Sequence, residues 1–95
     1  MAYVYILYSA KLKKYYIGSC LNLEERIAEH NNKKYSDSFT RKTDDWVLYF
    51  AISNLENKQA RLIEKHIKEM KSQLYSKNIK SYKEISEKLI EKYKQ

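Results

Sequence analysis

The pattern of apolar positions in the first third of the chain predicts a β-hairpin followed by a short helix. Residues 3–8 are mostly β-branched or aromatic and are apolar at both alternating sets of positions, which is typical of a strand buried on both faces. A short polar segment separates this run from a second predicted strand at residues 15–18, so the two strands are expected to pair antiparallel. Asn22 followed by Glu25 is typical of a capping box and predicts a helix that extends to about His30.

The remaining apolar positions predict a third strand and two further helices. Residues 46–52 form the most apolar run in the chain, and from Glu56 onward the apolar positions follow a helical period over four turns. The members of this stripe are Ala60, Ile63, Ile67, Met70 and Leu74. A last helix is expected over about residues 81–93. The expected order is therefore β-β-α-β-α-α, an α/β (α+β) domain in which helices flank a three-stranded, mostly antiparallel sheet.

Composition and charge favour one folded domain with an anionic partner. Ninety-five residues is the length of one domain, expected to span residues 1–95 with its core at about 3–75, and 43% apolar residues exclude a wholly disordered chain. The 19 Lys and Arg residues outnumber the 12 Asp and Glu residues, giving a net charge of +7 that, with ten tyrosines, favours nucleic acid. No membrane-span or signal-peptide pattern is present, and Cys20 is the single cysteine, so a cytoplasmic location without membrane association is expected.

The joint spacing of four polar residues is more informative than any of them alone. Tyr5 on the first predicted strand, Tyr16 on the second and Arg26 on the first helix follow one another at 11 and 10 positions, and Glu64 lies on the helix after the third strand. Residues 16–18 read Tyr-Ile-Gly. This arrangement resembles the GIY-YIG nuclease superfamily, and more narrowly its small single-domain members related to the N-terminal domain of the UvrC excision-repair subunit. The resemblance covers about residues 3–75.

The first of the two family motifs departs from the family pattern. Tyr3 and Val4 stand where the family has Gly and Ile, whereas Tyr5 retains the tyrosine of that motif. The second motif is present in full.

The resemblance implies a DNA endonuclease of the repair or recombination type that uses Mg²⁺ or Mn²⁺, with no small-molecule cofactor. In this reading Glu64 would hold the metal, which suits a single carboxylate completed by water and phosphate oxygens. Tyr5 would activate the attacking water, and Tyr16 would position that water or the phosphate. Arg26 would neutralise charge on the phosphoryl group. His30, one turn after Arg26 on the same helix face, would take a proton.

Two further sets of residues complete the expected site. Gly18 is the only glycine in the chain, so it is expected to lie where no side chain fits and to let the backbone approach the site. A basic segment precedes the third strand; its charges could serve solubility, but the net charge of +7 favours contact with DNA phosphates. Its cationic residues are Lys33, Lys34, Arg41 and Lys42.

Simpler roles remain open for the same residues. Arg26 could pair with Glu29 on a solvated face, and Glu64 could form a helix-stabilising pair with Lys68. A tyrosine, with an ordinary pKa of about 10, acts as a base at neutral pH only beside a cation. The alternative function is therefore a non-catalytic nucleic-acid-binding module on the same scaffold, and a protein partner or a homodimer is compatible with either function.

Overall fold

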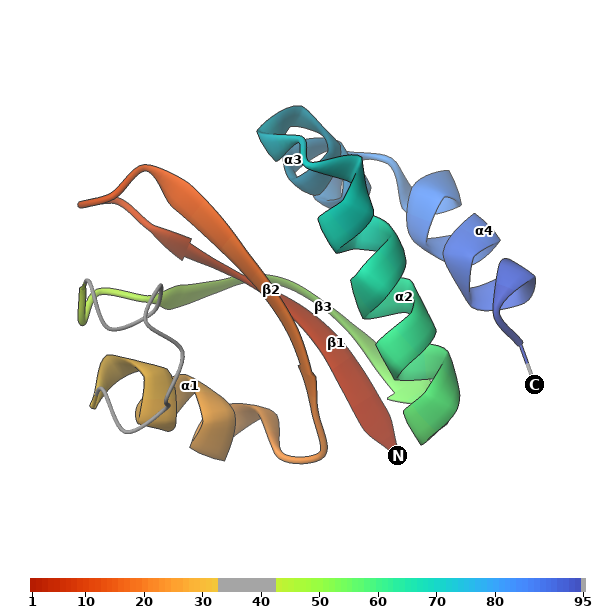
Figure 1. Ribbon diagram of the computed structural model, residues 1–95, viewed down its shortest axis with the longest axis horizontal. Helices are drawn as coiled ribbons and strands as arrows, with labels where there is room; N and C mark the ends of the chain where they lie inside the picture. The colour runs from red at the N-terminus through yellow and green to blue at the C-terminus, as the bar shows by residue number, and fades with distance from the viewer. Residues whose placement is uncertain (33–42, 95) are drawn as a thin grey trace.

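The computed structural model describes residues 1–32 and 43–94 of the chain and contains one three-stranded sheet with helices on both faces (Figure 1). In chain order the elements are β1 (Ala2–Ser9), β2 (Lys14–Cys20), α1 (Leu23–Asn31), β3 (Val47–Leu55), α2 (Asn57–Met70), α3 (Gln73–Ser81) and α4 (Lys83–Lys92). The strand order is β2-β1-β3, and both neighbouring pairs are antiparallel. Helices α2, α3 and α4 lie on one side of the sheet and α1 lies on the other. None of the described helices is long and apolar enough to cross a membrane.

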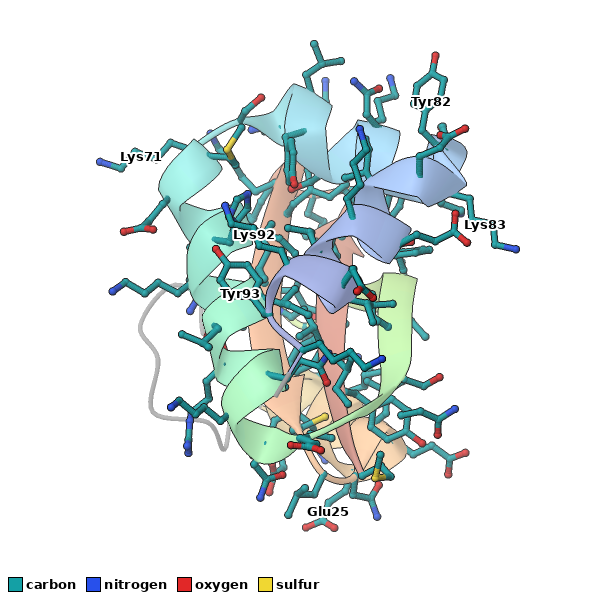
Figure 2. The ribbon with its side chains drawn as sticks, turned by 90° about the vertical axis from the view of Figure 1, so that its right-hand side faces the viewer. Glu25, Lys71, Tyr82, Lys83, Lys92 and Tyr93 are labelled. Atoms are coloured by element: carbon teal, nitrogen blue, oxygen red, sulfur yellow. The ribbon has the colours of Figure 1, made fainter. Side chains whose placement is uncertain are left out.

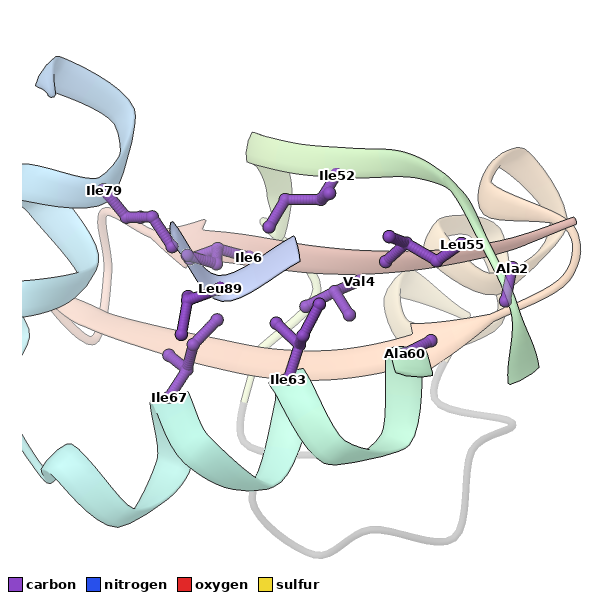
Figure 3. Packing of buried hydrophobic residues seen from close by; sticks show 10 residues of the cluster. All are labelled: Ala2, Val4, Ile6, Ile52, Leu55, Ala60, Ile63, Ile67, Ile79 and Leu89. Atoms are coloured by element: carbon purple, nitrogen blue, oxygen red, sulfur yellow. The ribbon is translucent and has the colours of Figure 1, made fainter. Parts of the chain in front are cut away.

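The main core lies between the sheet and α2 (Figure 3). Alternate side chains of the central strand β1, among them Val4 and Ile6, meet the apolar stripe of α2, where Ile63 and Ile67 are at most 2% exposed. The intervening β1 side chains, Tyr5 among them, are buried on the opposite face under α1. Burial of both faces explains why the sequence of β1 is apolar at successive positions rather than alternating.

The predicted fold class is confirmed, but one helix boundary was wrong. The stripe expected to reach Leu74 within one helix ends at Met70, because Lys71 adopts a left-handed conformation with a φ of 48°. Ser72 then caps a separate helix, α3, by accepting a hydrogen bond from the backbone N–H of Tyr75. Leu74 is 65% exposed and takes no part in the core. The observed order is therefore β-β-α-β-α-α-α.

Helix α1 is fixed to the sheet at its C-terminal end by an amide side chain. Asn31 accepts a hydrogen bond from the backbone N–H of Trp46 and donates one to the Trp46 carbonyl, both at 2.8 Å. The Trp46 side chain is 1% exposed and lies in the cluster beneath α1. These contacts hold the last turn of α1, which carries His30, against the tyrosine-bearing face of the sheet.

Candidate active site

Three side chains from β1, β2 and α1 meet on the α1 side of the sheet. The hydroxyl of Tyr5 lies 2.9 Å from Nε2 of His30, and both residues are 0% exposed. The Tyr16 ring is half-buried, with its centroid 6.4 Å from that of Tyr5 and 5.0 Å from the imidazole of His30. Two tyrosines that lie 11 positions apart in the chain are thus brought against one histidine by the β1–β2 pairing and the docking of α1.

Gly18 provides the space in which the Tyr5 ring lies. The two residues are directly opposite each other in the β1–β2 ladder. A Cβ atom placed on Gly18 would lie 2.6 Å from Cζ of Tyr5 and closer still to its hydroxyl, which is well inside van der Waals contact. Any other residue at this position would therefore displace the hydroxyl that contacts His30.

Arg26 lies on α1 one turn before His30, and its side chain is 28% exposed. Its Nε is 3.1 Å from Oε1 of Glu29, so the ion pair considered from the sequence is formed. The guanidinium also acts on Cys20 at the end of β2: burial raises the pKa of the Cys20 thiol, and the positive charge of Arg26 partly offsets that increase. Arg26 thus sets a positive charge beside β2, on the helix that carries His30.

Glu64 lies on α2, across the edge strand β2 from the tyrosines. Its Oε1 accepts a 2.6 Å hydrogen bond from the hydroxyl of Ser19, and its Oε2 is 2.7 Å from Nζ of Lys68. That ammonium group also lies 5.7 Å from the centroid of the Tyr16 ring. Lys68 therefore lies between the Glu64 carboxylate, on the α2 side of the sheet, and the Tyr16 ring, which belongs to the cluster on the α1 side.

A metal ion at Glu64 would have to be held by one carboxylate. Among the described residues no group of three or more His, Cys, Asp or Glu side chains could enclose an ion. A single carboxylate fits Mg²⁺, which commonly keeps several of its waters and takes its other ligands from substrate phosphate. The Glu64 carboxylate already forms an ion pair with the Lys68 ammonium, and an incoming metal would have to displace that ammonium from Oε2.

The structure therefore brings Tyr5, Tyr16 and His30 together, with Gly18 beneath Tyr5, and places Glu64 separately on α2. The four basic residues Lys33, Lys34, Arg41 and Lys42 lie outside the residues that the structure describes.

Sequence reasoning missed the role of Ser19 in the setting of Glu64. Ser19 lies 45 positions before Glu64 in the chain, so no local spacing indicates that they meet. Lys68 was considered as a partner of Glu64, but its approach to Tyr16 depends on how α2 packs beside β2.

The fold is that of a small α+β domain with one three-stranded antiparallel sheet. A family model described as the GIY-YIG catalytic domain matches residues 1–83, and the chain belongs to the GIY-YIG family. The members of this family are generally endonucleases that act on DNA. Comparison with curated proteins and with solved structures found no match.

Proposed function

We propose that this chain is a metal-dependent endonuclease that hydrolyses a phosphodiester bond in DNA, as a repair or recombination enzyme does. The observation that carries the proposal is the 2.9 Å contact between the Tyr5 hydroxyl and Nε2 of His30, with Tyr16 packed against both rings. A buried tyrosine hydroxyl needs a hydrogen-bond partner of some kind, and an imidazole is a partner that can also accept the hydroxyl proton.

The proposed proton path runs from the attacking water to Tyr5 and then to His30. A phenol has an ordinary pKa of about 10 and an imidazole one of about 6.5, so the imidazole is the neutral base that can take the hydroxyl proton. Transfer across the hydrogen bond leaves a phenolate beside an imidazolium, and the two opposite charges stabilise each other; the phenolate then takes the proton of the attacking water. Tyr16, the half-buried member of the cluster, orients the water or the phosphate.

The proposed charge stabilisation comes from both sides of β2. Arg26 carries a planar fork that matches two phosphate oxygens, and it would exchange Glu29 for the phosphoryl group when substrate binds. Glu64 would hold the Mg²⁺ or Mn²⁺ ion, which when bound supplies positive charge to the phosphoryl and leaving oxygens. Lys68, released from Oε2 of Glu64, would then be free to contact a phosphate.

One observation favours the alternative of a non-catalytic nucleic-acid-binding module. Tyr5 and His30 are both 0% exposed, so in this structure neither presents a polar atom to solvent. A module that only binds would use the +7 charge and the exposed lysines and would leave this pair as a buried structural contact.

Removal of the Tyr5 hydroxyl separates the two functions. In a plasmid-nicking assay with Mg²⁺ or Mn²⁺, Tyr5→Phe is expected to lose about 10²-fold or more of the wild-type rate, because the proton path is broken. Tyr93→Phe is the matched control, since it removes a hydroxyl that also lies 2.9 Å from a histidine, His66, but away from the proposed site, and it is expected to retain the wild-type rate. Nicking by Tyr5→Phe at the wild-type rate would exclude the proposed path. A folded wild-type chain that binds DNA but nicks it with neither metal would support the binding module.

A further inference from the structure

A groove outside the proposed catalytic cluster lies between β2 and the start of α3. Two adjoining hollows, of about 280 and 350 Å³, share Tyr15 and Gln73 in their linings. The first reaches Tyr16 and Lys68 and so begins at the cluster, while the second reaches Lys13 in the β1–β2 turn. We refer to the two hollows together as the tyrosine groove.

The charge of the tyrosine groove has one sign. Of the described residues that line it, four are lysines, and none is acidic. The four are Lys13, Lys68, Lys71 and Lys77. Lysines along a groove without opposing carboxylates in its lining create a positive potential that favours a chain of phosphates.

Three tyrosines give the tyrosine groove an aromatic lining. Tyr8, Tyr15 and Tyr16 each contribute to it, and the Tyr8 and Tyr15 ring centroids are 4.9 Å apart. Burial and the neighbouring Tyr49 raise the pKa of Tyr15, so this phenol stays neutral and adds no negative charge to the groove. Aromatic side chains in a basic groove are the groups against which unpaired bases stack.

Two of the groove lysines occupy backbone positions that suit glycine better. Lys13 has a φ of 53° and Lys71 a φ of 48°, a left-handed conformation in which any Cβ is strained. Each position therefore carries a cationic side chain although glycine would leave the backbone less strained. This strain also provides a test, since glycine at either position removes the charge while relieving the backbone.

We propose that the tyrosine groove binds an unpaired DNA strand that adjoins the scissile phosphate, with phosphates at the lysines and bases against the tyrosines. The inference deepens the proposed function and rests on it, because the groove begins at Tyr16 and Lys68. An unpaired strand is favoured over a duplex because paired bases are stacked inside the helix and offer no faces to the tyrosines. The substrate class would then be DNA with a single-stranded segment beside the cleaved bond.

The double variant Lys13→Gly/Lys71→Gly tests the groove without unfolding the protein. Its control, Lys83→Ala/Lys88→Ala, removes the same charge from the exposed face of α4, and Figure 2 shows that Lys71 and Lys83 extend to opposite sides of the molecule. Binding of a fluorescent oligothymidylate of about 20 nucleotides, and of a duplex of the same length, is measured by anisotropy in EDTA so that no cleavage occurs.

The groove variant is expected to bind the single strand about 10-fold more weakly. The slope of log affinity against log salt concentration is expected to be shallower by about 1.4, because two phosphate contacts are lost. Its melting temperature is expected to equal or exceed that of the wild type. The α4 variant is expected to change single-strand affinity less than about 3-fold, since it removes only long-range charge. Tyr15→Phe should retain single-strand binding and Tyr15→Leu should weaken it, because only the former keeps a ring.

The inference would be overturned if the groove and α4 variants lost the same single-strand affinity. It would also be overturned if the groove variant lost the same affinity for the single strand as for the duplex. Because the measurement contains no metal, it is independent of catalysis. A wild type that cuts no DNA but shows the expected binding pattern contradicts the proposed function alone, whereas a wild type that cuts DNA without the pattern contradicts the groove alone.

Discussion

Asp45 accepts three hydrogen bonds that the fold gathers around its carboxylate. The donors are the hydroxyls of Ser9 and Thr43, each at 2.6 Å, and the backbone N–H of Lys11 at 3.0 Å. These bonds lower the pKa of Asp45 to about 2, because each favours the ionised form. The carboxylate thereby ties the β1–β2 turn to the segment that enters β3.

This lowered pKa predicts a dependence of stability on pH. The unfolded chain has an Asp pKa of about 3.9, so the stabilisation by Asp45 is fully present above about pH 4 and is lost as the pH falls through about 2. The difference in the free energy of unfolding between wild type and Asp45→Asn, measured by denaturant titration, is expected to be constant near neutrality and to shrink toward pH 2. Asp44→Asn, at an exposed carboxylate paired with Lys11, is the control with little effect. A difference that does not vary with pH would show that the Asp45 charge plays no part.

Single residues also show what the sequence could and could not predict. The close packing at Gly18 was foreseeable, because a chain with one glycine places it where a side chain is excluded. The Tyr5–His30 bond joins residues 25 positions apart, and periodicity contains no information about such a contact. The resemblance to the GIY-YIG family implied that both belong near one site, but the docking of α1 determines that their polar atoms meet.

Helix α2 carries both the core and the proposed metal ligand. Ile63 is 0% exposed against β1, so Ile63→Ala is expected to lower the free energy of unfolding by about 2–5 kcal/mol through the cavity that it leaves. Met70→Ala, at the 46% exposed end of the same stripe, should cost less than about 1 kcal/mol. Urea denaturation of both variants measures the difference. Equal costs would mean that the stripe continues as one buried surface through Met70, as the sequence pattern alone suggested.

The end of α2 shows the limit of periodicity as a predictor of elements. Met70 and Leu74 are in phase with the buried stripe, so the apolar pattern alone extends the helix through them. The serine at position 72 offers the backbone a cap instead, and this local hydrogen bond starts a new helix. The pattern identified the buried face of α2 correctly because Ala60, Ile63 and Ile67 contact the sheet, but apolar identity at positions 70 and 74 did not ensure burial.

In the whole molecule the proposed machinery is divided by the edge strand β2. The tyrosines and His30 lie on the α1 side, Glu64 lies on the α2 side, and Lys68 stands between them. The order of elements predicted a sheet with helices around it, and the structure confirms that fold class. The sequence could not show how closely the two sides approach, because that distance depends on the packing of α2 against β2.

Cleavage of supercoiled plasmid by wild type, Glu64→Gln and Glu69→Gln in the presence of Mg²⁺ or Mn²⁺ tests the central claim most directly. Glu69→Gln makes the same change of charge at an exposed position of α2 and serves as the control. Wild type and Glu69→Gln are expected to cut alike, whereas Glu64→Gln is expected to fold and bind DNA but to cut at background, because it lacks the carboxylate that holds the metal. Cleavage by Glu64→Gln at the wild-type rate would contradict a metal-dependent endonuclease centred on Glu64.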